Sequence, residues 1–222
     1  MDRLAKVRAA RKKSPTPSVQ EWADRPSLFT QDRQPATEYL AIPEVSSENR
    51  QYIPMAFVPP SVIASNKLQF IVGASMFQFG VLNSSMHMAW VRVVSGRLES
   101  RISYAPSVYN NFPWPVGLTQ KQEGAVVAAA QGVLDARKNH PKASLEDLYD
   151  PLTMPADLRQ AHAKLDRAVE KCYRAEAFPT ERARAEHLFV LYQQQVMPLL
   201  RSAKNRGAKA ATIPRRRTAE AR

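Results

Sequence analysis

The hydrophobic pattern of this chain changes its period near Ala74, and this change limits the chain to a fold that combines strands with helices. Before it come three short apolar runs, bounded by turn-forming residues, that predict strands at 38–44, 51–58 and 69–72. After it, apolar residues from 74 to 93 recur near helical spacing. We therefore expect one or two helices there, with a break around residues 83–85.

Prolines and a glycine refine this reading. Pro43 and Pro54 have no backbone N–H to donate, so we expect them at edge or bulge positions of the strands. Gly96 is expected to end the helical segment as a C-terminal cap. Residues 97–104 then alternate, which predicts one further strand with Glu99 and Arg101 on the same face.

Beyond Pro115 the composition is helical, with an N-terminal cap expected at Thr119 and helices ending near 139, 173 and 197. The predicted fold class is α+β, a small mixed sheet with helices followed by an α-helical C-terminal domain. The expected segments are a basic stretch at 1–14, the α+β domain at 15–116, the helical domain at 117–200 and a disordered basic tail at 201–222.

The net charge of +12 lies entirely in the two ends of the chain, so residues 15–200 are formally neutral. Residues 3–13 could form a basic helix that brings Arg8, Arg11 and Lys12 within about one turn of each other. On DNA these side chains would contact phosphates. A solvated, partly frayed terminus explains the same residues equally well. Residues 14–18, with two prolines, are expected to form a linker or extended turn.

Other classes of site have little support. The single cysteine, Cys172, excludes an internal disulfide and is expected in the core. The four histidines are widely separated, so no metal site is expected, and His87 and His162 are expected to pack in the core. No apolar run is long enough to cross a membrane and no signal-peptide pattern begins the chain, which indicates a cytoplasmic protein.

Several short motifs occur together in an order that resembles one known family. They are YLAIPEVSSENRQYIPMAFV, FGVLNSSMHMAWVRVVSGRLESR and SVYNNFPWP, flanked by RAARKKSP and WADRPSLF before them and by SLEDLYDPLTMPADLRQAHAKLDRAVEKCY after them. The first three resemble the target-recognition region of MmeI-like DNA methyltransferases, the type IIL restriction–modification enzymes and their methylase-only relatives. The last resembles the helical C-terminal domain of that family. The resemblance covers residues from about 3 to 195.

The resemblance implies that the chemistry belongs to a different part of the enzyme. In that family a nuclease region and a methyltransferase domain precede the recognition region, and the latter binds S-adenosylmethionine through a glycine-containing loop and carries an Asn-Pro-Pro-aromatic motif. Neither motif occurs here, so no catalytic residue and no cofactor are expected in this chain. Asn110–Pro113 imitates the catalytic motif but lacks its double proline. We expect it to be a structural joint, with Phe112 and Trp114 as core anchors.

Glu99 and Arg101 are the candidates for reading bases. Arg can donate two hydrogen bonds to guanine O6 and N7, and Glu can accept one from the cytosine amino group. The region is associated with base selection in the family that the chain resembles. The alternative is a surface ion pair of little energetic value. Arg50 and Lys67, in predicted loops, are the candidates for further phosphate contacts.

Together these observations predict the DNA target-recognition and C-terminal part of an S-adenosylmethionine-dependent adenine-N6 methyltransferase, without its catalytic domain. Duplex DNA is the expected partner, and a separate methyltransferase polypeptide is a second one if the enzyme is split. The start of the chain inside the recognition region favours a truncated product over a split enzyme. Two alternatives stay open: a stand-alone sequence-specific DNA-binding or adaptor protein, and an RNA-associated protein with basic tails.

Overall fold

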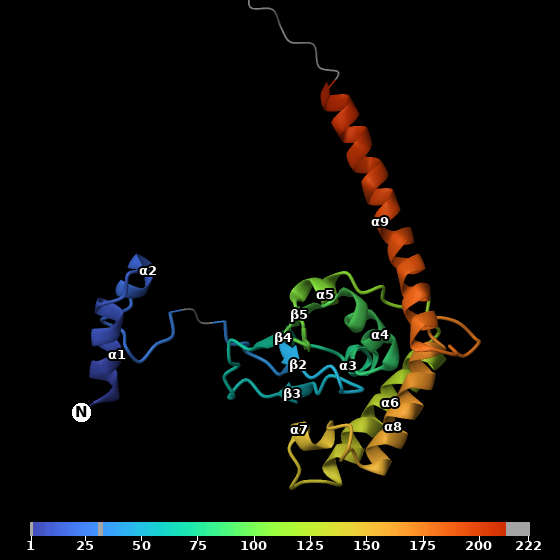
Figure 1. The fold of residues 1–222 in the computed structure, drawn as a ribbon, viewed down its shortest axis with the longest axis horizontal. Helices are drawn as coiled ribbons and strands as arrows, with labels where there is room; N and C mark the ends of the chain where they lie inside the picture. Colours follow the sequence, from blue (N-terminus) through green and yellow to red (C-terminus); the bar gives the residue numbers. More distant parts are fainter. Residues whose placement is uncertain (1, 31–32, 212–222) are drawn as a thin grey trace, which may run out of the picture. The chain divides into compact units, whose positions relative to one another are not determined.

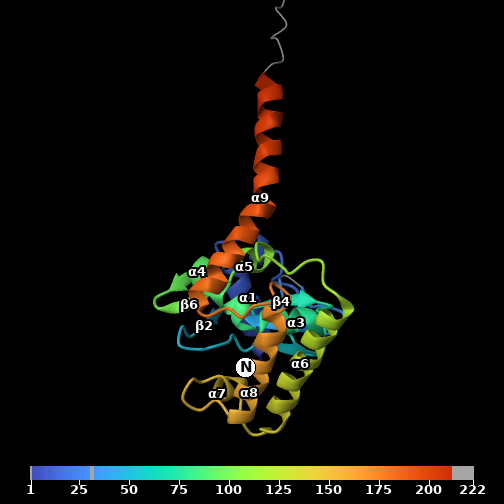
Figure 2. The same ribbon diagram turned by 90° about the vertical axis from the view of Figure 1, so that its right-hand side faces the viewer.

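The structure, a computed structural model, describes residues 2–30 and 33–211, the last thirteen of them by their backbone alone. The chain divides into two compact units, Met1–Ala36 and Thr37–Arg222. Each unit is considered by itself, and Figures 1 and 2 show the course of the chain within them.

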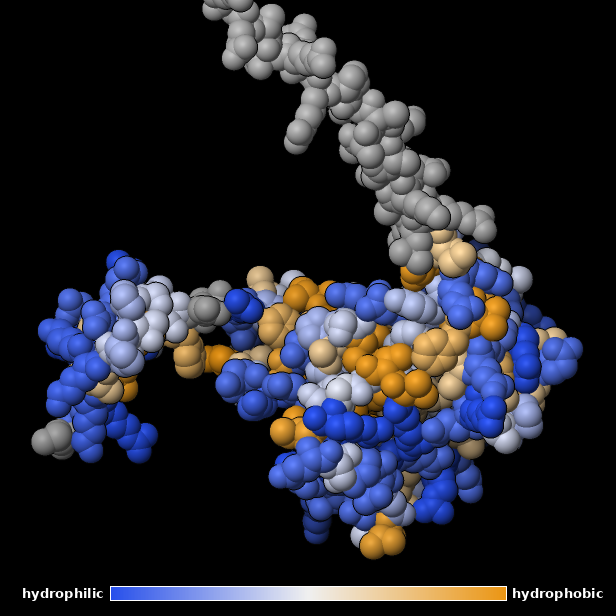
Figure 3. Space-filling model, turned by 45° about the horizontal axis from the view of Figure 1, so that its top comes forward, coloured by the Kyte–Doolittle hydropathy of each residue, from blue (hydrophilic) through white to orange (hydrophobic). Residues whose placement is uncertain are grey.

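The first unit is built on a basic helix, as predicted. Helix α1 (Arg3–Lys12) begins where Asp2 accepts a hydrogen bond from the Leu4 amide at 3.0 Å. The expected linker at 14–18 is partly wrong, because a short helix, α2 (Pro17–Gln20), begins at Pro17. Proline is well suited to a first helical position, where its missing N–H has no partner to lose. Hydrophilic side chains cover most of this unit in the view of Figure 3.

The second unit begins with a three-stranded sheet in the order β3–β1–β4. Strand β1 (Tyr39–Pro43) pairs antiparallel with β3 (Ala56–Val58) and with β4 (Leu68–Val72). The prolines fall differently from the expectation. Pro43 closes the central strand instead of lying at an edge, and Pro54 precedes β3, which shortens the strand predicted at 51–58 to its last three residues. A proline at the end of a strand interrupts only the last possible rung of hydrogen bonds, which explains why Pro43 is tolerated.

A second antiparallel sheet has the order β2–β6–β5 and contains the largest departure from the sequence reading. Its strands are β2 (Val45–Ser46), β5 (Gly96–Leu98) and β6 (Arg101–Ser103). The single strand predicted at 97–104 is wrong, because the chain turns back at Glu99 and Ser100 to form a hairpin. Glu99 has a φ of 57°, in the left-handed region. Gly96 is not a helix cap: it begins β5, and the preceding helix ends at Val94 with Ser95 as its cap.

The helices between these strands confirm the predicted break. Helix α3 (Met76–Leu82) is followed at once by α4 (Ser85–Val94), and the short α5 (Pro106–Asn110) follows the second sheet. Ser84 caps α4 with a side-chain oxygen that accepts from the His87 amide at 3.5 Å. A serine in this position favours a new helix start over continuation of the old helix, because its side chain bonds the otherwise free first-turn amides.

Four helices follow, and the expected helices among them are confirmed. They are α6 (Gln120–Lys138), α7 (Leu145–Leu148), α8 (Ala156–Glu170) and α9 (Glu181–Ala211). Thr119 caps α6 as predicted, with Gln122 as its reciprocal partner. Helix α9 continues through Ala211, beyond the end expected near residue 197, and residues 212–222, the rest of the tail expected to be disordered, lie outside the described residues.

One hydrophobic core joins the strands and helices of the second unit. It runs from Leu40 of β1 and Trp90 of α4 to Leu165 of α8 and Leu188 of α9, all essentially inaccessible to solvent. Helices α6 and α8 lie side by side in Figures 1 and 2 and pack against α3. The expected boundary at 116 and 117 therefore separates two stretches of sequence that share a core.

Polar side chains cross this core in a connected network. The Arg137 guanidinium donates to the Met55 carbonyl at 2.7 Å and to the Tyr149 hydroxyl at 2.9 Å. That hydroxyl also lies 2.7 Å from His162 Nε2, and His162 stacks on the ring of Tyr52. The expectation of a hydrogen-bonded core histidine is confirmed for His162. Burial, together with the smaller effect of the nearby Arg137 charge, lowers its pKa to about 3.

Candidate nucleic-acid interface

The second sheet brings two exposed polar segments together. Ser46 of β2 pairs with Ile102 of β6, and Val45 pairs with Ser103. Ile102 is fully buried and anchors the hairpin to the core, whereas the turn at its tip is exposed. The loop that leaves β2, residues 47–50, therefore runs beside the hairpin tip, and the two segments form one polar surface.

Glu99 and Arg101 lie at this tip. Arg101 Nη2 donates to Glu99 Oε2 at 2.9 Å, and the two side chains are 47% and 79% exposed, respectively. Their expected geometry, two residues on one face of a strand, is wrong because Glu99 lies in the turn. They are nevertheless adjacent and open to solvent. In the structure the two side chains form the surface ion pair. The remaining donors of Arg101 and the remaining carboxylate oxygen of Glu99 face solvent.

Glu48 is a member of this surface that sequence reasoning missed. The pKa of Glu48 is lowered first by a hydrogen bond from its own backbone, then by Ser100 and by the fields of Arg97 and Arg101. The only sequence signal would have been the register of β2 with β6, which pairs segments more than fifty residues apart.

A second acid–base pair lies where the two sheets meet. Lys67 Nζ is 3.7 Å from Glu44 Oε2, and the Glu44 amide donates to the Lys67 carbonyl at 2.9 Å. Glu44 connects β1 to β2, and its carbonyl accepts from the Tyr104 amide just beyond β6. Lys67 was predicted as a phosphate contact. It is 72% exposed, which leaves it accessible to a ligand.

The remaining predicted phosphate contact of this unit, Arg50, is largely covered. Its side chain is only 16% exposed, and Nη2 lies 3.8 Å from Glu146 Oε1 on α7. It lines a pocket of about 380 Å³ whose walls are mainly apolar residues of β1, β3 and β4, together with Leu145 and Glu146. The guanidinium therefore faces the edge of a groove, where a single weak ion pair holds it.

In the first unit, the three predicted phosphate contacts differ in what they do. The Arg11 guanidinium donates to the backbone carbonyls of Trp22, Arg25 and Leu28 at 2.9, 2.6 and 2.6 Å. Arg11 thus joins the segment after α2 to α1. The three hydrogen bonds that its guanidinium donates are made within the chain and involve no ligand. Arg8 is exposed, and Lys12 Nζ forms only a long contact with Asp24 at 3.9 Å.

The stretch that imitates a catalytic motif is structural. Asn111 ends α5, and its side-chain amide donates to the Ser107 carbonyl at 2.8 Å. Phe112 is buried and packs edge-on against Trp114 at 5.3 Å between ring centres. Both aromatic residues lie in the core or against it, as predicted.

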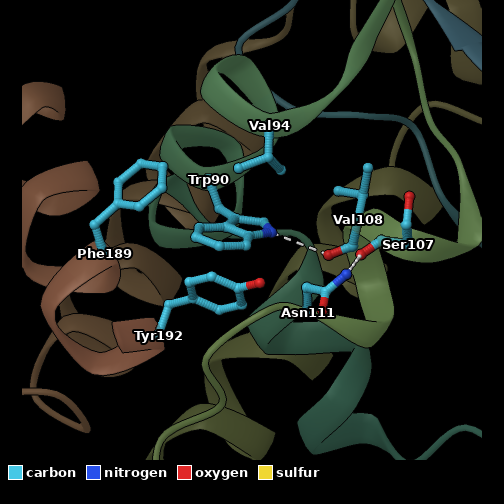
Figure 4. Close-up of a pocket in the computed structure, with 7 residues that line it drawn as sticks. All are labelled: Trp90, Val94, Ser107, Val108, Asn111, Phe189 and Tyr192. Atoms are coloured by element: carbon cyan, nitrogen blue, oxygen red, sulfur yellow. Dashed lines mark hydrogen bonds between the residues drawn. The ribbon is translucent and has the colours of Figure 1, made fainter. Parts of the chain in front are cut away.

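A smaller cavity adjoins this joint (Figure 4). It has a volume of about 160 Å³ and is lined mainly by Trp90, Val94, Val108, Phe189 and Tyr192, between α4, α5 and α9. Two hydrogen bonds are drawn there: Trp90 Nε1 donates to the Val108 carbonyl at 3.0 Å, and the Asn111 side-chain amide donates to the Ser107 carbonyl at 2.8 Å. Its lining includes no acid, base or nucleophile held in a reactive geometry.

The described part of the chain does not fit S-adenosylmethionine. Neither the cavity at Trp90 nor the groove at Arg50 is lined by a glycine, and the glycines with positive φ, Gly73 and Gly117, belong to separate turns. Within the same residues, no group of three metal-ligating side chains comes together, and no helix combines the length and apolar character needed to cross a bilayer.

Two family models match successive parts of the chain. The family model described as "MmeI, target recognition domain" matches residues 1–116, and that described as "MmeI, C-terminal domain" matches residues 118–200. DNA methyltransferase A of Bacillus subtilis (strain 168) is 36% identical over 194 residues, which are 87% of this chain and 22% of that protein.

A solved structure is also similar. It is described as the type IIL restriction-modification enzyme MmeI in complex with DNA, with a TM-score of 0.82 and 47% identity over 88% of this chain and 26% of that one. The chain thus spans about a quarter or less of the length of these two relatives. With both family models matched in succession, the chain belongs to the MmeI family and comprises its target recognition and C-terminal domains.

Proposed function

We propose that this chain reads the target sequence in duplex DNA for an S-adenosylmethionine-dependent adenine-N6 methyltransferase, whose catalytic segment lies outside these 222 residues. The observation that carries the proposal is the exposed Glu99–Arg101 pair at the tip of a hairpin anchored by Ile102. Further support comes from the relatives, of which one is named a DNA methyltransferase and the other was solved with DNA.

The energies favour exchange of the ion pair for base contacts. An exposed pair contributes about 0–1 kcal/mol, because water screens both charges. A well-aligned contact between Arg and guanine, or between Glu and cytosine, contributes about 1–3 kcal/mol of discrimination. Arg101 and Glu99 therefore lose little when they separate and gain more when each meets its base. One C·G pair would satisfy both side chains.

Phosphate contacts would then position the hairpin on the duplex. We assign this role to Arg8 and Lys12 of the first unit and to Arg50 and Lys67 of the second. Such contacts orient a protein without reading sequence. Arg11 is left out of this set because three carbonyl groups already occupy its guanidinium.

The test exchanges the two charges. Selection of randomised duplexes by the purified chain, followed by sequencing, should enrich one base pair at the position that Glu99 and Arg101 read. The double variant Glu99→Lys, Arg101→Asp should enrich a different pair there, with a change of about 1–3 kcal/mol in discrimination.

A matched control reverses another exposed ion pair, that of Arg182 and Glu186 on α9. The variant Arg182→Glu, Glu186→Arg changes the same charges and should leave the selected sequence as it is. If both double variants select the sequence of the unmodified chain, the assignment of Glu99 and Arg101 to base reading is wrong.

A further inference from the structure

We propose that Arg92 is a positioning residue for base reading: it ties both edges of the sheet β2–β6–β5 to helix α4, and so sets the direction of the hairpin tip. This inference rests on the proposed function and deepens it. Because helices α7 and α9 hold Arg92 and its loop in place, it also gives the stretch matched by the C-terminal family model a part in target recognition.

On one edge of the sheet, Arg92 holds strand β5 of the hairpin. Its backbone carbonyl lies in the last turn of α4, where carbonyl groups have no partner within the helix. Arg97 Nη2 donates a hydrogen bond to this carbonyl at 3.0 Å. In the β5–β6 ladder Arg97 lies opposite Ile102, the neighbour of Arg101. The bond therefore joins the hairpin to the end of α4.

On the other edge, the Arg92 guanidinium holds the loop that leaves β2. Its Nη2 donates to the Arg50 carbonyl at 3.1 Å, and the Arg50 amide closes the loop by donating to the Ser47 carbonyl at 3.3 Å. Strand β2 has only two residues, of which Ser46 lies opposite Ile102. A strand this short makes few hydrogen bonds of its own, so its position beside β6 depends on where its loop is held.

The two contacts restrict the direction in which the tip points. Strand β6 is the central strand of the sheet and carries Arg101, and Ile102 anchors it in the core. Contacts on either side of β6 limit how far the small sheet can tilt about this anchor. Both are made to one residue of α4, a helix whose residues Met86–Val91 are buried. Base reading needs such support, because a binding group must be held within about 0.5 Å of its productive position.

The C-terminal helices in turn hold Arg92 and the loop. The second nitrogen of its guanidinium, Nη1, bonds to the Glu181 carboxylate at the start of α9. The planar guanidinium can serve both partners at once in a fixed geometry, which the single nitrogen of a lysine cannot do. The Arg50 side chain approaches Glu146 on α7 at 3.8 Å. The loop is thus tied to acids of two C-terminal helices, once directly and once through Arg92.

Three variants and a control test this arrangement. Arg92→Met removes the two bonds that the guanidinium donates and keeps the carbonyl that Arg97 reaches. Arg97→Met removes the contact at the hairpin edge alone. Glu181→Gln removes the charge that faces Arg92. The control is Arg182→Met, which removes an exposed arginine that also pairs with a carboxylate of α9.

Each full-length variant is examined by selection of randomised duplexes, by affinity for one random-sequence duplex and by thermal unfolding, with the selections made below every unfolding midpoint. We expect discrimination at the position read by Glu99 and Arg101 to fall about tenfold in Arg92→Met and in Arg97→Met, as for one misaligned base contact. It should fall by less in Glu181→Gln, because the bond to the loop carbonyl remains. Arg182→Met should select as the unmodified chain does.

A purely structural role of Arg92 gives a different pattern. It would lower the unfolding midpoint of Arg92→Met and leave the selected sequence unchanged. In a positioning role, the affinity of both arginine variants for random duplex should equal that of Arg182→Met, which has lost the same charge. Arg97 and Glu181 are exposed, so Arg97→Met and Glu181→Gln carry the test if Arg92→Met does not fold.

The inference and the proposed function fail differently. If the unmodified chain enriches no sequence, the proposed function is wrong and the role of Arg92 is wrong with it. If the unmodified chain enriches a sequence and either Arg92→Met or Arg97→Met selects it as sharply as Arg182→Met does, only the role of Arg92 is overturned. Loss of discrimination that is accompanied by an equal loss of affinity for random duplex would also contradict a positioning role.

Discussion

Arg137 is the residue that ties the strands of the second unit to its C-terminal helices. From α6 it donates to the carbonyl of Met55, beside β3, and to the hydroxyl of Tyr149, beyond α7. It also approaches the Asn83 side chain at 3.3 Å, between α3 and α4. A single guanidinium therefore satisfies polar groups from three parts of the chain in a place from which water is largely excluded.

We expect Arg137→Met to lower the free energy of unfolding by roughly 2–4 kcal/mol, because the Met55 carbonyl and the Tyr149 hydroxyl lose a charged donor and stay buried. Urea unfolding followed by circular dichroism would measure it. The neighbouring Lys138→Met, which removes an exposed amine paired only with Asp135, should change stability by less than about 0.5 kcal/mol. Equal effects of the two variants would contradict the role of Arg137.

The buried histidines make stability depend on pH. Burial lowers the pKa of both His87 and His162 to about 3, against an ordinary value of 6.5. Between those values the unfolded chain binds protons that the folded chain does not. Their stabilising contribution is therefore complete above pH 6.5, and it is lost progressively as the pH falls toward 3.

The free energy of unfolding should fall on acidification from pH 6.5 by about 1.4 kcal/mol per pH unit for each histidine. Urea unfolding at pH 7.5, 6.0 and 5.5 would measure this slope above the range where Asp166, whose pKa burial raises, adds an opposite trend. His162→Gln should have a shallower slope than the unmodified chain. Identical slopes in the two proteins would contradict the assignment.

At the scale of elements, the contact of α3 with the C-terminal helices depends on a glycine. A Cβ on Gly80 would lie 2.9 Å from Val126 Cγ1 of α6 and 3.3 Å from Leu165 Cδ1 of α8. The absence of a side chain therefore allows three helices to approach closely. Gly132 of α6 has nothing within 4 Å of the same position, so it offers a matched comparison in an uncrowded helix.

Gly80→Ala should destabilise the protein, because overpacking costs about 1–3 kcal/mol and the gain in helix propensity offsets only about 1 kcal/mol of it. Gly132→Ala should stabilise the protein by up to about 1 kcal/mol, since propensity acts there alone. Thermal unfolding of the two variants would measure opposite shifts of the midpoint. A rise in both midpoints would show that the helices separate without cost.

Local sequence patterns predicted most of the helices. The features that they did not predict depend on pairing between residues far apart in the sequence. The break between α3 and α4, for example, follows from Ser84 as a cap and the flanking apolar spacing. The turn of the hairpin at 96–103 contains no glycine, asparagine or proline, so the alternation in the sequence continues through Glu99 and predicts one strand. The surroundings of Glu48 and Arg11 could not be predicted for a related reason, because each residue has neighbours that only the folded chain brings near.

At the scale of the whole molecule, the second unit has one core although two family models cover its sequence. Trp90 of α4 packs against Phe189 and Tyr192 of α9, at 5.3 and 5.5 Å between ring centres. The strands that carry the polar surface therefore depend on helices from the far end of the sequence. Neither stretch has a separate set of buried side chains large enough to be distinguished from the common core.

This unit should consequently unfold in a single transition. In a Trp22→Phe chain, where Trp90 and Trp114 report on the second unit, fluorescence and far-ultraviolet circular dichroism should give the same urea midpoint. Tyr192→Ala, which removes a ring packed on Trp90, should shift both midpoints together and lower the free energy of unfolding by roughly 1–3 kcal/mol. Two separated midpoints would contradict a shared core.

The burial of Ile102 directly beneath an open hairpin turn bears on how such a protein can diversify. Because the turn residues pack against little, inherited changes at Glu99 or Arg101 are nearly neutral for folding. New residues can therefore arise at Glu99 and Arg101 without earlier compensating substitutions elsewhere in the chain. Ile102, by contrast, tolerates few replacements, since each would leave a void in a dense interior. Selection would therefore conserve the buried base of the hairpin while the residues of its exposed turn vary from one descendant to the next.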